Sequence, residues 1–340
     1  MVFRPRRRPA ALGLSIVTVC RNRRDHLLRS ATAVARWPHH AEHLVVDWSS
    51  SEPLRRADLP DDPRLQLLRV DGERGWNLCR AYNFAIARAS HHLIFKLDAD
   101  CWPLEPFDLQ ALLGQGPASV CAFGTGFEGG KGQFLIERGL FEAVGGFNEY
   151  LIDYGFDDKD LRARLRMLRG RDPDDIPLNW LQVIPHSDAD RAELRRGLLL
   201  TPLEQSLALA RMRSSRLANR LLAAHYPWSN RAAASQYMES RAQCWQVQRG
   251  TVPVPAGDAA EELEHARRMV FWGTFLAIPE IFLGLLPFKL FPPAREGHWP
   301  VRWWHRAYWH TGRRLLEVPV ALLSCTRGTL QKTLTLLGRG

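Results

Sequence analysis

The chain has 340 residues and a mass of 38.8 kDa, with 46% hydrophobic and 24% charged residues. This composition excludes a disordered tail, a collagen and a disulfide-stapled mini-protein. Its net charge of +10 is unevenly placed, because residues 1–190 carry 25 basic and 26 acidic side chains whereas residues 191–340 carry 21 and 10. The neutral first half and basic second half disfavour a nucleic-acid surface spread over the whole chain.

The start of the chain combines a basic cluster with an apolar run. Arg4 and the arginines at 6–8 precede Ala10–Cys20, an order that also occurs in secretory signal peptides. The run is rich in β-branched residues and lacks a small-residue cleavage site, so a buried strand is favoured. The six cysteines are scattered singly, which indicates reduced thiols in the cytosol; they are Cys20, Cys79, Cys101, Cys121, Cys244 and Cys325.

The first half alternates short β-branched runs with segments of helical periodicity, a pattern typical of βαβ units and a mainly parallel sheet. The expected strands are Leu14–Cys20, His43–Trp48, Leu65–Val70, Leu93–Leu97, Ser119–Phe123, Gln133–Ile136 and Leu181–Ile184. The expected helical segments are Asp25–Arg36, Asn77–Ala89, Leu140–Val144 and Asp157–Leu168. A proline-marked loop is expected at Asp172–Pro177.

The second half is predicted to be helical and rich in arginine. Helices are expected at Leu203–Ala224 and Ala232–Val247, followed by a linker at Gly250–Gly257. We therefore expect four parts, which are a basic tail (1–11), an α/β domain (12–195), a helical extension (196–256) and C-terminal helices that associate with a membrane (257–340).

The membrane expectation rests on residues 270–320. The segment Val270–Leu290 is dominated by Phe, Trp, Leu and Ile and is long enough, at ~20 residues, to cross a bilayer. Prolines interrupt it and Glu280 lies at its middle, so a re-entrant or interfacial hairpin competes with a span. Tryptophans and arginines then interleave over 299–314, as in segments at headgroup depth. We expect peripheral or integral attachment to the cytoplasmic membrane face; packing of these aromatics in a helical subdomain or partner interface is the alternative.

Two carboxylates, Asp98 and Asp100, stand at alternate positions after the buried strand Leu93–Leu97. Ligands bind outside the carboxyl ends of the strands of an open parallel sheet, so both side chains are predicted at the mouth of a crevice. Carboxylate oxygens suit Mn²⁺ or Mg²⁺, and such a metal could neutralise a substrate diphosphate. An acidic pair can also merely cap a helix.

A second acidic pair, Asp157 and Asp158, begins a predicted helix. The helix dipole stabilises an ionised carboxylate there, and such a group in a cleft can act as general base toward a hydroxyl. An ordinary helix cap is the alternative. His186 follows the last predicted strand and could complete a metal shell begun by Asp100, although a lone histidine is more often structural.

These motifs together resemble the nucleotide-sugar glycosyltransferases of the GT-A fold, family 2 type, with a central segment similar to β-1,4-galactosyltransferases and bacterial chondroitin polymerases. The resemblance covers about residues 12–190 and implies an α/β fold with a mainly parallel sheet flanked by helices. It implies that Asp98 binds the ribose side of the donor, that Asp100 and His186 hold Mn²⁺ or Mg²⁺, and that Asp158 deprotonates the acceptor.

The same resemblance assigns the remaining site residues. It places Thr18, Cys20 and Arg21 at the nucleoside pocket, Asp47 at the base, and Arg80 at the donor phosphates with Asn83 in support. It places Gly146, Tyr154 and Asp157 at the acceptor site. Trp48 after Asp47, and Phe156-Asp157 in place of the Gly-Glu of the galactosyltransferase pattern, depart from the family.

The resemblance predicts an inverting, metal-dependent transferase. It would move a hexose or N-acetylhexosamine from a nucleotide-diphosphate sugar, UDP-sugar favoured, to a glycan or lipid-linked acceptor, and it could work as a homo-oligomer. A catalytically silent GT-A module acting as a membrane-bound scaffold or carbohydrate-binding protein is the alternative. A metal-dependent nucleotidyltransferase is disfavoured because no Gly-rich loop follows the first strand. No nucleic-acid partner is expected, because no such motif is present.

Overall fold

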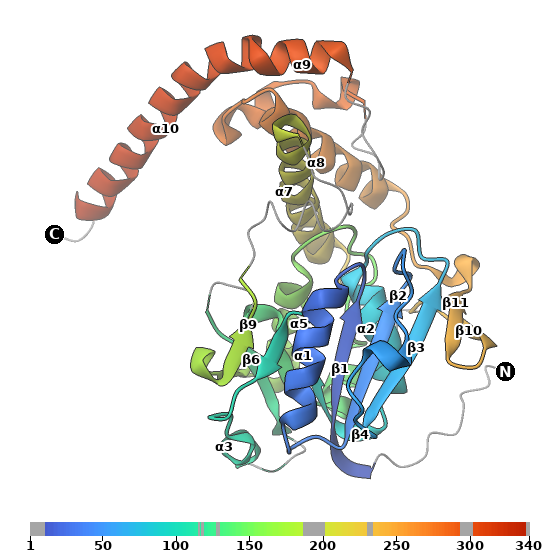
Figure 1. Ribbon diagram of the computed structural model, residues 1–340. Coiled ribbons are helices and arrows are strands. Elements are labelled where there is room, and N and C mark those ends of the chain that lie inside the picture. The colour runs from blue at the N-terminus through green and yellow to red at the C-terminus, as the bar shows by residue number, and fades with distance from the viewer. Residues whose placement is uncertain are drawn as a thin grey trace. The chain divides into compact units, whose positions relative to one another are not determined.

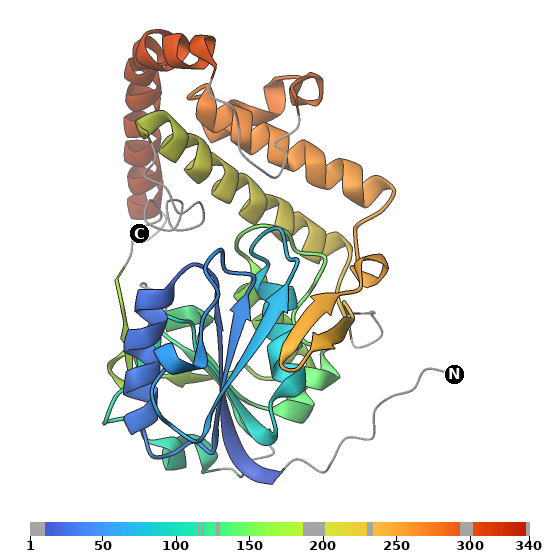
Figure 2. The same cartoon turned by 45° about the vertical axis from the view of Figure 1, so that its right-hand side comes forward.

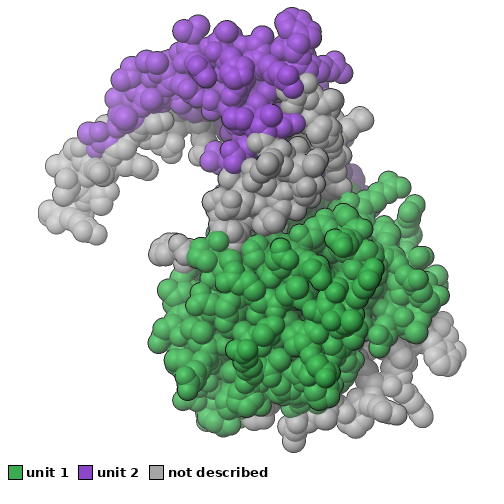
Figure 3. All heavy atoms as spheres, viewed as in Figure 1, with its two compact units in different colours: residues 1–187, 222–255 green, residues 188–221, 256–340 purple. Residues whose placement is uncertain are grey.

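The computed structural model describes residues 11–114, 116, 119–126, 130–185, 201–229, 234–292 and 302–337. The chain divides into two compact units, coloured separately in Figure 3. Unit 1 comprises residues 1–187 and 222–255, and unit 2 comprises residues 188–221 and 256–340. All six cysteines are unpaired thiols, and five of them are buried.

Unit 1 is built on a nine-stranded sheet of order β10-β11-β3-β2-β1-β4-β7-β6-β8. Its strands are β1 (Ala11–Cys20), β2 (Glu42–Trp48), β3 (Leu65–Asp71), β4 (His91–Lys96), β6 (Cys121–Gly124), β7 (Phe134–Glu137), β8 (Asp174–Ile176), β10 (Tyr237–Arg241) and β11 (Cys244–Val247). The five strands from β11 to β4 are parallel to one another, whereas β7 is antiparallel to both of its neighbours. The sheet is therefore mostly parallel, and β1 lies at its centre between the parallel strands β2 and β4.

Helices flank this sheet, and a second small sheet pairs β5 (Cys101–Pro103) with β9 (Leu181–Val183). Figure 1 shows α1 lying in front of the large sheet, and α2 packs against β1 and β2. The helices of unit 1 are α1 (Arg24–Arg36), α2 (Leu78–Arg88), α3 (Leu109–Leu113), α4 (Arg138–Ala143) and α5 (Asp157–Arg169). Short 3₁₀ turns lie at Arg56–Asp58, Gly130–Gly132, Leu178–Trp180 and Arg249–Thr251.

The core of unit 1 follows directly from the apolar runs of the sequence. Every residue of β2 is buried, as expected for an interior strand of a parallel sheet. On α1, Leu27, Ala31 and Val34 are buried, and their spacing of four and three places them on one helical face. This face packs against the strands, so the strand ends are held in a fixed relation to the helices that follow them.

Most of the elements predicted for unit 1 are present close to their predicted bounds, and the strand interpretation of Leu14–Cys20 is confirmed. Two predictions are wrong. The segment Ala232–Val247 is not a helix, because its described residues form the antiparallel pair β10 and β11, which extends the sheet beside β3. The loop predicted at Asp172–Pro177 contains β8, which pairs with β6. Both errors concern short strands with little apolar periodicity, whose pairing comes from backbone hydrogen bonds.

Unit 2 is helical. It contains residues 202–221 of α7 (Pro202–His225), α8 (Asp258–Phe275), the 3₁₀ turns Glu280–Leu285 and Phe288–Leu290, α9 (Trp303–His310) and α10 (Gly312–Leu337). The two long helices α7 and α8 can be followed in Figure 2. Its core joins Leu203 and Leu207 of α7 to an aromatic group from the following segments, namely Phe271, Trp272, Phe275 and Phe288.

The apolar run predicted to meet a membrane therefore supplies much of the core of unit 2. Tyr308 and Trp309 of the aromatic-basic segment also pack against this core, and the hydroxyl of Tyr308 donates a hydrogen bond of 2.9 Å to the carbonyl of Leu276. These contacts agree with the alternative in which the aromatics pack a helical subdomain. Among the described residues, no helix combines the length and the apolarity that crossing a membrane requires.

Candidate active site

A buried lysine organises the carboxyl end of β4. The Lys96 side chain is 1% exposed, and its ammonium donates to Asp98 Oδ1 at 2.7 Å and to the carbonyl of Gly132 at 2.9 Å. Asp98 Oδ1 also accepts from the Tyr82 hydroxyl at 3.0 Å, and Asp98 Oδ2 accepts from Gln133 Nε2 at 2.7 Å. The carboxylate predicted to hold the donor ribose is thus fixed by three donors.

This network sets the charge of Asp98. Burial by itself would raise the pKa of Asp98, but the Lys96 ammonium and the hydrogen bonds from Lys96, Gln133 and Tyr82 outweigh burial and hold the pKa below its ordinary value. The Asp98 side chain keeps 31% of its surface exposed. An ionised, oriented acceptor of hydrogen bonds therefore faces solvent at the strand end, which is the chemistry needed to bind sugar hydroxyls.

Asp100 lies two residues further along and is almost fully buried. Its Oδ2 accepts a hydrogen bond of 2.9 Å from Arg23 Nη1, which comes from the turn between β1 and α1. His186, predicted as the second metal ligand, lies outside the described residues. In the part of the chain that the structure describes, no group of three or more His, Cys, Asp or Glu side chains is arranged to hold a metal ion.

The second acidic pair begins α5, as predicted. Asp157 Oδ1 accepts from the backbone N–H of Asp158 at 3.0 Å, and Asp158 Oδ1 accepts from that of Lys159 at 2.8 Å. Burial, followed by the charge of Asp158, raises the pKa of Asp157 to about 6. Lys96 opposes this rise in pKa and Asp98 adds to it, so the acidic pair is electrostatically coupled to the network at the end of β4.

The turn before α5 holds an uncommon backbone conformation. Phe156 occupies the cap position of the helix with φ 75°, and Asp153 and Gly155 also have positive φ. Positive φ is costly for a bulky residue such as phenylalanine and is found where surrounding structure imposes it, often at functional sites. Tyr154, predicted at the acceptor site, lies half-buried within this turn.

The loop at 145–149 is fastened to α2 and to residues from much later in the chain. Asn83 Nδ2 donates to the carbonyl of Phe147 at 2.9 Å and to Glu149 Oε1 at 2.8 Å. Gly146 has φ +71°, and a Cβ there would lie 2.5 Å from Asn83 Oδ1, so only glycine fits. Asn83 thus supports the predicted acceptor loop rather than reaching into open space.

Two of these later residues escaped the sequence analysis. The indole N–H of Trp228 donates to the carbonyl of Gly145 at 2.8 Å, and Ser235 donates to Glu149 Oε2 through its backbone N–H at 2.8 Å and its hydroxyl at 2.6 Å. The sequence predicts a helical extension over residues 196–256 and shows no motif that indicates chemistry there. Neither Trp228 nor Ser235 belongs to a recognisable sequence motif. Their contacts with the loop at 145–149 form only because residues 222–255 fold back into unit 1.

The predicted donor-phosphate residue Arg80 is paired with a carboxylate. Its Nη2 donates to Glu73 Oε2 at 2.6 Å, and the Tyr237 hydroxyl donates to Glu73 Oε1 at 3.1 Å. Arg21 reaches the same loop, where its guanidinium donates to the carbonyls of Glu73 and Gly75 at 3.0 Å each. Both arginines therefore organise the loop between β3 and α2.

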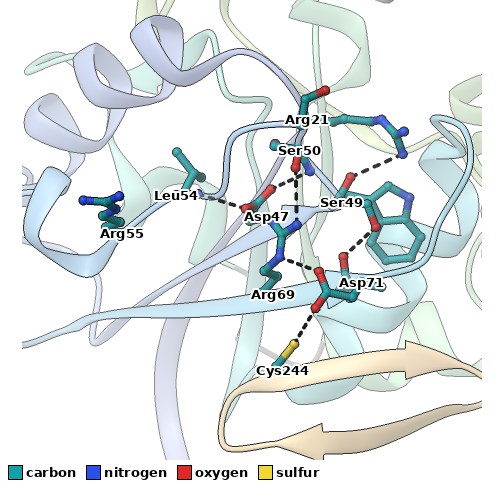
Figure 4. Close-up of polar contacts among 12 residues, drawn as sticks. Arg21, Asp47, Ser49, Ser50, Leu54, Arg55, Arg69, Asp71 and Cys244 are labelled. Carbon is teal, nitrogen blue, oxygen red and sulfur yellow. Dashed lines mark hydrogen bonds and ion pairs between the residues drawn. The ribbon is translucent and has the colours of Figure 1, made fainter.

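The remaining residues predicted for the nucleoside pocket are buried. Asp47 is fully buried, and its carboxylate accepts from Arg69 and from the backbone N–H groups of Ser50 and Leu54. Figure 4 shows Arg69 between Asp47 and Asp71, with the Cys244 thiol on the far side of Asp71.

Thr18 and Cys20 complete the predicted nucleoside set, and both point into packed surroundings. The Thr18 hydroxyl lies 3.2 Å from His43 Nε2, and burial raises the pKa of the Cys20 thiol to about 12. Three of the predicted nucleoside-pocket residues are therefore buried beneath the carboxyl ends of the strands, namely Thr18, Cys20 and Asp47. In contrast, Asp98 and the pair at 157–158 are partly exposed.

Comparison with known proteins supplies one family. Residues 15–151 match the family model of glycosyl transferase family 2, a span that contains β1 to β7 and the Lys96 network. No curated protein sequence matches the chain.

Three solved structures with a similar fold each have a TM-score below 0.5. The catalytic domain of Drosophila β1,4-galactosyltransferase 7 in complex with xylobiose is 14% identical, with 74% of this chain and 98% of that chain covered and a TM-score of 0.43. The mannosyltransferase of Pyrobaculum calidifontis in complex with GDP-Man and Mn²⁺ is 16% identical, with 94% and 88% covered and a TM-score of 0.44. Glucosyl-3-phosphoglycerate synthase of Mycobacterium tuberculosis, with Mn²⁺, UDP and phosphoglyceric acid, is 13% identical, with 72% and 88% covered and a TM-score of 0.44. At these values the likenesses carry no conclusion about this chain.

Proposed function

We propose that the chain is a family 2-like glycosyltransferase, which the match over residues 15–151 supports, and that it transfers a hexose or N-acetylhexosamine from a nucleotide-diphosphate sugar to a hydroxyl of a glycan or lipid-linked acceptor. UDP-sugar is the favoured donor class, and the anomeric configuration inverts. The mostly parallel sheet with flanking helices is the α/β GT-A fold that the motifs predicted.

The observation that supports this function is the electrostatic coupling of two acidic sites. Asp98 is ionised and oriented at the end of β4 by Lys96, and Lys96 and Asp98 both act on the pKa of Asp157 at the start of α5. In the proposed reaction the first of these sites binds sugar hydroxyls and the second accepts a proton, and the two lie within electrostatic reach of each other. Inverting transfer requires this pairing.

Asp158 is the proposed general base. The acceptor oxygen attacks the anomeric carbon, the bond from that carbon to the diphosphate oxygen breaks, and the diphosphate leaves with the bonding electrons. The acceptor proton passes to the Asp158 carboxylate. Asp157, whose pKa is raised to about 6, binds a proton below that pH and places a negative charge beside Asp158 only above it.

Asp100 is the one described carboxylate proposed to take part in a cation site that substrate phosphates would complete. Asp100 offers a hard carboxylate donor at the strand end, and Mg²⁺ in such sites commonly takes one or two carboxylates together with substrate phosphates. Asp100 would hold Mn²⁺ or Mg²⁺, with His186 as the proposed second ligand, and the bound metal would stabilise charge on the leaving diphosphate. The Arg23 ion pair would keep the Asp100 carboxylate oriented between turnovers.

The experiment measures release of nucleoside diphosphate by the full chain with Mn²⁺ and a panel of UDP-, GDP- and dTDP-sugars. We expect release with one donor class, and a loss of about 10²–10⁴-fold in kcat for Asp158→Asn. Asp172→Asn, which removes a carboxylate that is 70% exposed in the same unit, is the matched control and should keep full activity.

Two outcomes would contradict the proposal. Nucleotide binding without turnover of any donor, unaffected by Asp158→Asn, would favour a catalytically silent module. Turnover with retention of the anomeric configuration, read by NMR of the product, would exclude direct displacement assisted by Asp158.

A further inference from the structure

Helix α10 exposes a continuous set of aliphatic side chains, here called the apolar stripe. The exposed fractions are 77% for Leu315, 45% for Leu316, 64% for Val318, 64% for Leu322 and 44% for Leu323. Single exposed leucines are ordinary on protein surfaces, but an exposed contiguous group is typical of an interaction site. The stripe thus requires a partner that covers it.

Helical geometry places these residues on one side of α10. Leu315, Val318 and Leu322 are separated by three and four residues, so their side chains lie in one row along the helix. Leu316 and Leu323 are seven residues apart and form a parallel row beside it. The stripe is about as wide as the apolar face of an amphipathic helix that lies on a surface.

Several aromatic side chains elsewhere in unit 2 are buried. Phe271, Phe275 and Phe288 are each at most 3% exposed, and they pack with Tyr308 and Trp309. The aromatic side chains of the apolar run therefore form a core, although Leu285 and Leu290 at the end of the run are 75% and 83% exposed. Helix α10 differs in that its exposed aliphatic side chains lie in adjacent rows along one regular helix with arginines beside them.

Basic side chains border the stripe. Arg313 and Arg314 precede Leu315, and on an ideal helix they fall on opposite margins of the two aliphatic rows. Arg313 stacks over the Trp309 ring at 3.9 Å and pairs with Glu317. Arg306 and Trp303 on α9 are exposed, Trp303 by 80%.

We propose that the apolar stripe docks in the plane of an anionic lipid surface, with Leu315, Val318 and Leu322 among the acyl chains and the arginines at the lipid phosphates. Apolar insertion and attraction of arginine to anionic headgroups add in this geometry. A second copy of the chain is the competing occupant, because a two-fold contact could also cover the stripe, and the test below distinguishes the two. The inference does not depend on the proposed reaction.

The test is flotation of the full chain with vesicles of phosphatidylcholine, with and without phosphatidylglycerol. We expect flotation with the anionic vesicles, weakened by added salt. Leu315→Ser/Val318→Ser/Leu322→Ser should lower the partition coefficient at least about tenfold, since three buried aliphatic side chains are lost. Arg306→Gln/Arg314→Gln should remove the preference for the anionic vesicles.

The matched control is Met167→Ser/Leu178→Ser, which removes two side chains of unit 1 that are 82% and 55% exposed and should leave flotation unchanged. Sedimentation velocity and thermal melts of every variant accompany the assay. Flotation of the triple variant equal to that of the wild type would overturn the proposal. A wild-type dimer that the triple variant converts to monomer, with no flotation of either, would assign the stripe to self-association instead.

Discussion

The sheet unit and the helical unit use large apolar side chains in different ways. In unit 1 the bulky residues Trp48, Tyr82 and Phe95 are all fully buried, and polar side chains at the strand ends are paired with one another. In unit 2, Phe275 is buried while Trp303 and Leu315 are among the most exposed residues of their kinds. Composition does not distinguish these cases, because partners rather than residue type decide burial.

The largest expected effect comes from truncating a buried apolar side chain of unit 2 and comparing its cost with that of truncating an exposed one. Phe275→Ala removes a side chain that is 1% exposed and should cost about 3–5 kcal/mol of unfolding free energy through lost burial and a cavity. Leu322→Ala removes one that is 64% exposed and should change stability by less than about 0.5 kcal/mol. Urea unfolding followed by tryptophan fluorescence measures both. Equal costs would mean that the stripe is covered within the chain.

A second effect concerns the buried charge of unit 1. Lys96→Met leaves the carboxylate of Asp98 without its cation and should cost about 1–3 kcal/mol, because Asp98 loses a charged hydrogen-bond donor but keeps partial exposure to solvent. Lys96→Met/Asp98→Asn removes both charges and should be more stable than Lys96→Met alone. Both variants are expected to weaken donor binding, which calorimetry with UDP would measure. A double variant less stable than the single one would show that the Asp98 carboxylate is stabilised mainly by its hydrogen bonds from Tyr82 and Gln133 rather than by the charge of Lys96.

The elements that the sequence predicted well are those with a strong repeating signal. The buried run Val45-Val46-Asp47 and the helical spacing of Leu27, Ala31 and Val34 marked a strand and a helix that the structure contains. Strand β10 carries almost no such signal, because four of its five residues are exposed. Its pairing depends on β11 and β3, which only the folded chain brings together.

The candidate site shows the same division. Asp98, Asp157 and Asp158 could be chosen from the sequence because acidic pairs at a strand end and a helix start are visible in the chain. The partners that set their charge could not be chosen in this way. Lys96 is two residues from Asp98, but its burial and its bond to Gly132 arise only when β7 pairs with β4. Trp228 and Ser235 reach the acceptor loop from more than eighty residues away.

The smallest effect tests whether the two acidic sites are coupled by charge. The folded chain holds the pKa of Asp157 at about 6, above the ordinary value of 3.8, so the folded state binds the proton more tightly than the unfolded state does. Stability from this group is therefore present below pH 4, falls as the pH rises from about 4 to 6, and stays lower above pH 6.

Asp157→Asn keeps the oxygen that accepts from the N–H of Asp158 but cannot ionise. Its melting temperature should exceed that of the wild type at pH 7, and the two should converge below pH 4. Scanning calorimetry across this range measures the difference, with Asp172→Asn as the exposed control. A constant offset at every pH would place the origin of the shift in packing and remove Asp157 from the charge network around Lys96.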